Sequence, residues 1–196
     1  TPNKDDLEWP RTYNASISVA KRLPWRNVLE VGYVGTWGRQ LVGQQNKNIV
    51  QIGGLNAYSQ DPLLRAAIDG NVYNRYRQYP TISTVNLPVY GGVSDYHSLQ
   101  ATLSRQSGDF TYLVAYTLSK AEGTVTTDFA QLDPFPGWEE RNYGVLATDR
   151  THILNFSWTW RVPFQAKDGI AKILLNDWNL SGISTYSTGI PWRPFF

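Results

Sequence analysis

The chain has 196 residues, of which 14% are aromatic and only 17% are charged, and its formal net charge is +2. It contains no Cys, which excludes disulfides, zinc–thiolate sites and cysteine nucleophiles. Arg and Lys are scattered rather than clustered, so we expect no nucleic-acid partner, and no apolar run approaches the roughly 20 residues of a membrane-spanning helix.

Six segments alternate between apolar and polar residues with a period of two, which predicts strands with two different faces. In chain order they lie near residues 12–21, 28–36, 95–105, 110–119, 152–161 and 177–187. Segment 110–119 is the clearest, because one of its faces would carry Phe110, Tyr112, Val114, Tyr116 and Leu118. The segments are long enough to supply the roughly 9–11 residues with which a tilted strand crosses a bilayer.

The connections between these segments alternate in length. Residues 23–27 and 106–109 form short links, residues 162–176 form an intermediate one, and the loops 38–93 and 120–148 are long. Outer-membrane barrels combine short periplasmic turns with long extracellular loops, so the alternation predicts that the long loops face outward. Inside the first long loop, residues 61–70 are predicted to form a short helix, and a second is expected at 170–175.

These patterns predict an all-β fold, in which one segment over residues 1–196 forms about six antiparallel up-and-down strands of an outer-membrane β-barrel. In lipid every backbone N–H and C=O must pair internally, so a sheet spans only as a closed barrel, with apolar side chains outward. Aromatic residues near the expected strand ends suit the membrane interface: Trp9, Tyr13, Trp25, Trp37, Phe164, Trp178, Tyr186 and Trp192. The alternative is a soluble β-sandwich or barrel with an aromatic core.

Several short motifs occur in a fixed order along the chain and carry a resemblance to a known family. They are LPW and VLEVGYVG within 16–36, YHSLQATLSR at 96–105, YTLSK at 116–120, DRTHIL at 149–154, WNLSGI at 178–183 and STGIP at 187–191. The ordered set resembles the barrel of TonB-dependent receptors of the Oar-like, carboxypeptidase-regulatory-domain type.

This resemblance implies an outer-membrane transporter with a 22-stranded barrel, an N-terminal plug and a segment that binds TonB. The sequence contains no recognisable plug or TonB box, and about six strands are fewer than the 8 of small membrane barrels. We therefore expect the wall to be completed by the remainder of a barrel or by copies of the chain itself. TonB would act only through segments missing from this sequence, and outer-membrane lipid is the other expected partner.

The candidate chemical sites are few, and we assign no catalytic, cofactor-binding or metal-binding residue. His97 and His152 are the only histidines, and hydrogen bonding at strand ends suits them better than a two-histidine metal site. Glu139 and Glu140 lie in the second long loop without the oxygen-ligand spacing of a calcium loop. The polar cluster around Asp149 predicts an ion-paired strand entry.

A set of loop aromatics and cations is the candidate ligand-binding site, because flat rings stack on peptides or sugars and Arg pairs with carboxylates. These residues are Tyr73, Arg75, Tyr76, Arg77, Tyr79 and Trp138. Loop-on-loop packing is the alternative interpretation for the same residues. No readable motif names the transported substrate.

Three hypotheses about function follow. The leading one is a barrel wall of a nutrient transporter in the bacterial outer membrane, without chemistry of its own. The second is a self-assembling structural protein outside the cell, which would form tubes or filaments through open sheet edges, since unpaired edges template strand addition. The third is a secreted hydrolase that depends on Glu139 or Glu140.

Overall fold

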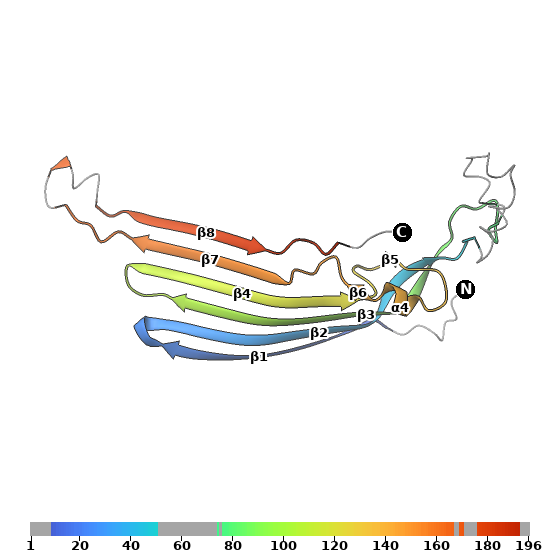
Figure 1. The fold of residues 1–196 in the computed structure, drawn as a ribbon, viewed down its shortest axis with the longest axis horizontal. Coiled ribbons are helices and arrows are strands. Elements are labelled where there is room, and N and C mark those ends of the chain that lie inside the picture. Colours follow the sequence, from blue (N-terminus) through green and yellow to red (C-terminus); the bar gives the residue numbers. More distant parts are fainter. Residues whose placement is uncertain (1–8, 51–73, 75, 167–168, 171–175, 193–196) are drawn as a thin grey trace. The chain divides into compact units, whose positions relative to one another are not determined.

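The computed structural model describes residues 9–50, 74, 76–166, 169–170 and 176–192. Six long strands form one sheet in the order β1-β2-β3-β4-β7-β8 (Figure 1). Their bounds are β1 Arg11–Leu23, β2 Asn27–Asn46, β3 Asn86–Arg105, β4 Phe110–Gly123, β7 His152–Arg161 and β8 Asn179–Ser187. Each long strand lies beside the next long strand along the chain, so the all-β, up-and-down fold class is confirmed.

Shorter elements complete the described structure. Strand β5 (Ala130–Gln131) pairs with β2 in parallel, and β6 (Gly144–Val145) pairs with β4. Among the described residues, the helices with assigned bounds are one 3-10 turn, η2 (Pro24–Arg26), and one α-helix, α4 (Trp138–Asn142). No helix within the described ranges is long and apolar enough to cross a membrane. The helix predicted at 61–70 lies outside the described residues, as does nearly all of the one predicted at 170–175.

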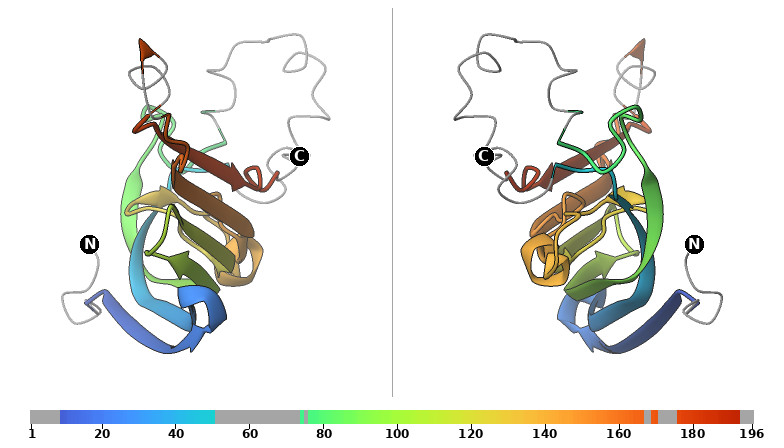
Figure 2. Two further views of the ribbon diagram at one scale, coloured as in Figure 1. Left: turned by 90° about the vertical axis from the view of Figure 1, so that its left-hand side faces the viewer. Right: turned by 90° about the vertical axis from the view of Figure 1, so that its right-hand side faces the viewer.

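The chain divides into two compact units, which are described separately below. The sheet unit comprises Thr12–Trp37, Asp95–Glu122 and Val145–Phe196, and the loop unit comprises Thr1–Arg11, Gly38–Ser94 and Gly123–Gly144. Within the sheet unit, β4, β7 and β8 follow one another in antiparallel register, and β7 and β8 are seen side by side in Figure 2. Within the loop unit, a small core forms around Val125, Leu132 and Trp138, with Leu41, Val89 and Ala130 packed against it.

Strands β2 and β3 extend further than the sequence pattern predicted. Residues 38–46 and 86–93, which we expected to belong to the long loop 38–93, are strand residues. Strand β4 likewise continues to Gly123, into the predicted loop 120–148. Positive backbone φ angles at Gln40 (56°) and Gly91 (109°) mark where regular extended geometry is interrupted in β2 and β3. Such irregularities exchange the two faces of a strand, so the period-two pattern stops there although the strand continues.

The link between β1 and β2 is a tight turn, as the sequence predicted. Trp25 and Arg26 both have positive φ, 59° and 62°, and the backbone N–H of Asn27 donates to the carbonyl of Pro24. Two consecutive residues with positive φ are the signature of a type I′ turn, whose twist matches that of paired strands. Asn27 also donates its side-chain amide to the Pro24 carbonyl at 3.0 Å, which closes the hairpin a second time.

Candidate functional site

The β4–β7 register places aromatic and aliphatic side chains together on one surface of the sheet unit. Directly paired positions there are Phe110–Trp160, Tyr112–Trp158, Val114–Phe156, Tyr116–Leu154 and Leu118–His152. Strand β8 continues the same surface, because Tyr186 pairs with Leu154 and Leu180 with Trp160. We call this surface the apolar face. It remains open to its surroundings, with Leu118 38% exposed and Tyr186 64% exposed.

The opposite surface of the sheet unit, the polar face, carries hydroxyl and amide groups. Thr111 pairs with Thr159, and Thr185 donates to Asn155 at 2.9 Å across β7 and β8. Thr36 donates to Asn14 at 2.8 Å, which places the even-numbered residues of β1 and β2 on one side. Two hollows open among these groups, with volumes of about 610 and 300 Å³. The polar lining residues are Ser104, Arg105, Ser157, Thr159 and Ser181 in the larger, and Ser16, Glu30, Gln100 and Thr102 in the smaller. Apolar residues line them as well, among them Leu113 and Ile183 in the larger and Ile17 and Val34 in the smaller.

Each histidine of the chain hydrogen-bonds a tyrosine of a neighbouring strand. The hydroxyl of Tyr33 lies 2.6 Å from Nδ1 of His97, and the hydroxyl of Tyr116 lies 2.7 Å from Nδ1 of His152. Both ring pairs are stacked, and Trp37 meets His97 edge-on with ring centroids 5.6 Å apart. The predicted hydrogen bonding at a strand end is confirmed for His152, which begins β7, whereas His97 lies within β3. The sequence did not indicate that both partners would be tyrosines.

Asp149 closes the end of the β4–β7 pairing with its side chain. The Ala121 backbone N–H donates to the Asp149 carboxylate at 2.8 Å, and the Thr151 hydroxyl donates to it at 3.2 Å. Asp149 is buried, and Arg150 donates instead to the backbone carbonyls of Ala147 and Asp149. Hydrogen bonds that the carboxylate accepts from a backbone N–H and from a hydroxyl thus hold this strand entry, where we expected an ion pair.

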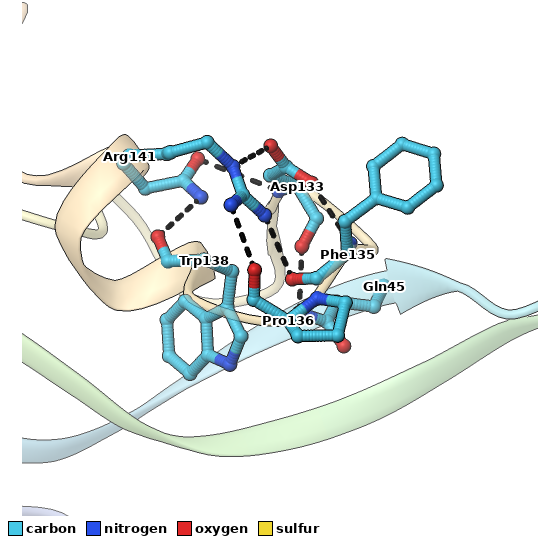
Figure 3. Close-up of polar contacts among 7 residues, drawn as sticks. Gln45, Asp133, Phe135, Pro136, Trp138 and Arg141 are labelled. Atoms are coloured by element: carbon cyan, nitrogen blue, oxygen red, sulfur yellow. Dashed lines mark hydrogen bonds and ion pairs between the residues drawn. The ribbon is translucent and has the colours of Figure 1, made fainter. Parts of the chain in front are cut away.

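The loop unit is organised by an ion pair between Asp133 and Arg141 (Figure 3). The Arg141 guanidinium donates to the Asp133 carboxylate at 2.6 Å and to the carbonyls of Pro136 and Phe135 at 2.7 and 2.9 Å. Gln45, buried on β2, donates its amide to the Asp133 carbonyl at 2.7 Å. These contacts tie α4 and its preceding turn to β2, so this part of the second long loop has a defined shape.

The same ion pair shifts the protonation of both partners. The hydrogen bond from Arg141 holds the pKa of Asp133 below its usual value; partial burial opposes this shift, and the Phe135 backbone N–H, donating at 2.8 Å, reinforces it. The bond also raises the pKa of Arg141. Asp133 therefore stays ionised in the loop unit at neutral pH, where its two acceptor roles need the charge.

Asn48 holds the segment of the first long loop that precedes β3. Its side chain is 0% exposed and donates to the carbonyls of Tyr79 and Ile82 at 3.0 and 2.5 Å, while its oxygen accepts the Tyr79 backbone N–H at 2.9 Å. Next to it, the Asn46 side-chain oxygen accepts the N–H groups of Asn48 and Val85 at 3.0 and 3.1 Å. Beyond the end of β2, hydrogen bonds from two asparagine side chains to the backbone thus take the place of backbone pairing between strands.

The predicted ligand-binding residues are placed as follows. Tyr73 and Arg75 lie outside the described residues. Tyr79 is 49% exposed, beside the Asn48 contacts, and Tyr76 and Arg77 are partly buried. Trp138 is 9% exposed and lies in the core of the loop unit, which favours the packing interpretation for that residue. For the other described members the ligand role stays a prediction.

The loop carboxylates do not assemble into a recognisable metal centre. Glu139 and Glu140 lie in the first turn of α4 and border a hollow of about 480 Å³ with Tyr143, Thr124 and Val93. In the part of the chain that the structure describes, no group of three or more His, Asp or Glu side chains is placed to hold a metal ion.

A sheet whose aromatic, apolar face is left open and whose opposite face carries hydroxyls and amides is typical of the wall of a strand-built membrane protein, which meets lipid on one side and water on the other. The family comparison agrees with this class. The chain belongs to the outer membrane beta barrel domain family, whose model matches residues 1–195. No curated protein and no solved structure gives a significant match. Family membership supports a location in the outer membrane.

Proposed function

We propose that the chain is the barrel wall, with outward loops, of a TonB-dependent nutrient transporter, and that it carries out no chemical reaction itself. The observation that carries the proposal is the register of β4 with β7, which separates a lipid-compatible face from a hydroxyl-rich one. The hollows on the polar face, where Ser, Thr, Gln and Arg lie beside apolar residues such as Leu113 and Ile183, suit a lumen that a hydrophilic solute passes or that a plug fills.

The organised loops support a role in recognition. Barrel transporters take up ligand from outside, so loops at the ends of the strands need a defined shape in order to select it. The Asp133–Arg141 pair and the Asn48 contacts supply such shape in the two long loops. The exposed aromatic Tyr79 and the partly buried Arg77 beside it suit a peptide or sugar, through ring stacking and charge pairing.

The membrane and transport parts of the proposal are tested separately. For the membrane part, the full-length protein is expressed in an outer-membrane host and assayed for membrane fractionation and heat-modifiable gel migration. Recovery as a detergent-free soluble monomer would contradict a barrel wall. For the transport part, uptake of fluorescent oligopeptide and oligosaccharide mixtures is compared between cells with and without TonB. Uptake that does not depend on TonB would exclude this transporter class.

A second candidate is a self-assembling structural protein. Strands β1 and β8 stand at the two ends of the strand order, each paired on one side only among the described residues. An unpaired edge offers a row of N–H and C=O groups to another chain, so copies could join edge to edge. Electron microscopy of the purified protein distinguishes the candidates, because regular tubes or filaments are expected only for the second.

A further inference from the structure

A hollow on the sheet unit combines apolar and cationic groups from neighbouring strands. It has a volume of about 580 Å³, and its lining includes Tyr33, His97, Leu99, Leu118 and Lys120. The other lining residues are Ser98 and Ser119, Val145 of β6, and residues of the segments that follow β6 and β8. Leu118 belongs to the apolar face by its pairing with His152, and Leu99 and Leu118 are 49% and 38% exposed. The hollow thus presents two uncovered leucines beside an ammonium group.

The position of Lys120 along β4 corresponds to the outer edge of the lipid-facing band. Lys120 lies two positions after Leu118, so its side chain is on the same side of β4. It is ten residues beyond Phe110, the first residue of the strand. At about 3.3 Å per residue and a tilt of about 40°, ten residues span roughly 25 Å along the membrane normal. This equals the height of the apolar band of outer-membrane barrels, about 25 Å. Lys120 therefore lies at the level of lipid headgroups, and Leu118 just within the hydrocarbon.

Charged and polar groups surround the Lys120 ammonium. The Asp149 carboxylate also lines the hollow, where it accepts hydrogen bonds from the Ala121 backbone N–H and the Thr151 hydroxyl. The carboxylate of Glu122, on the same side of β4, lies 2.8 Å from the Lys120 ammonium. The His97 ring is held by Tyr33 and Trp37. When the Tyr33 hydroxyl donates to Nδ1, the imidazole proton resides on Nε2 and can donate to an oxygen of a ligand.

We propose that this hollow binds a phosphorylated lipid of the outer leaflet, with an acyl chain on Leu99 and Leu118 and the phosphate beside Lys120 and His97. Lys and imidazole N–H groups are donors for phosphate oxygens, and the leucines below them match a hydrocarbon chain rather than a soluble anion. The proposal rests on the lipid-facing orientation of the apolar face and is independent of nutrient transport. Glu122 acts against the ligand, since its charge competes with the phosphate for Lys120.

The proposal is tested with the full-length protein, purified in detergent and titrated with phosphatidylcholine vesicles that contain bisphosphorylated lipid A or the dephosphorylated form. We expect tighter binding of the phosphorylated form, a loss of about tenfold in that preference for Lys120→Gln, and a gain for Glu122→Gln. The matched control is Lys21→Gln, an exposed lysine on β1 near the opposite end of the strands, which should leave the preference unchanged.

Three outcomes would overturn the proposal. Equal losses for Lys120→Gln and Lys21→Gln would show general attraction of a cationic protein to anionic vesicles. Displacement of the lipid by inorganic phosphate alone would show a soluble-anion site. An unchanged preference for the phosphorylated lipid in Lys120→Gln would show that Lys120 does not bind the phosphate and that the hollow is not the lipid site. Heat-modifiable migration of every variant is measured first, and transport is assayed apart, so failure of the lipid site is distinguishable from failure of the barrel or the transporter.

Discussion

The indole of Trp158 on β7 covers the backbone of Gly182, its paired residue on β8. A Cβ placed at position 182 would lie 2.8 Å from Nε1 of Trp158 and 2.9 Å from its Cε2. Because glycine has no side chain, the Trp158 ring can lie across the neighbouring strand. The ring thereby covers the position of Gly182 on the apolar face.

Gly182→Ala is expected to displace the Trp158 ring and lower the free energy of unfolding by about 1–3 kcal/mol, as overpacking does. The measurement is urea unfolding of the protein folded in detergent, followed by tryptophan fluorescence. Gly189→Ala is the control, because no heavy atom lies within 4 Å of a Cβ built there. Equal stability of the two variants would show that the ring moves aside without cost.

Asp149→Ala is expected to destabilise the end of the β4–β7 pairing, because the Ala121 N–H would lose its acceptor in a buried position. A buried donor without a partner costs about 1–3 kcal/mol. Asp149→Asn keeps an acceptor oxygen and should cost less. Hydrogen exchange at the Ala121 amide reports the change directly, and faster exchange in Asp149→Ala than in Asp149→Asn is the expected order. Identical protection in both variants would contradict the role assigned to the carboxylate.

The bilayer-spanning part of the fold was predictable because two solvents impose a strict alternation of side chains. Strand β7 was predicted at its observed bounds, and β4 begins at Phe110 as expected. Beyond the apolar band this constraint ends, and the irregular residues Gln40 and Gly91 break the pattern while backbone pairing continues. The extensions of β2 and β3 could therefore not be recognised from periodicity.

The individual contacts were less predictable, because they depend on the register between strands. Sequence distance does not show that His97 meets Tyr33, 64 residues away, or that Asn48 meets Tyr79. Trp138 illustrates the same limit: an aromatic residue in a long loop suits a ligand surface and a local core equally. Only the packing of Leu132 and Val125 around it decides in favour of the core.

The Asp133–Arg141 pair gives the loop unit a defined dependence on pH. The pKa of Asp133 is lower in the folded loop than its unfolded value of about 3.9, so the stabilisation is complete above that value. It is lost as the pH falls through the lower, folded pKa. Local hydrogen exchange around α4 between neutral and strongly acidic pH checks this, and Asp133→Asn should remove the dependence. A transition in the loop unit that persists in Asp133→Asn would assign it to another group.

Asn48→Asp tests whether the shape of the first long loop depends on the hydrogen bonds of the Asn48 side chain. Aspartate is nearly the same size as asparagine, but when ionised it only accepts hydrogen bonds, so the bonds to the carbonyls of Tyr79 and Ile82 would be replaced by repulsion. Because the side chain is fully buried, we expect Asn48→Asp to release residues 78–84 to proteases more strongly than Asn48→Ala does. Heat-modifiable migration should be unchanged in both Asn48 variants, since Asn48 lies in the loop unit. If Tyr79 belongs to the ligand surface, both variants should also weaken uptake of the fluorescent oligopeptide or oligosaccharide mixture; intact uptake with a released loop would remove Tyr79 from that surface.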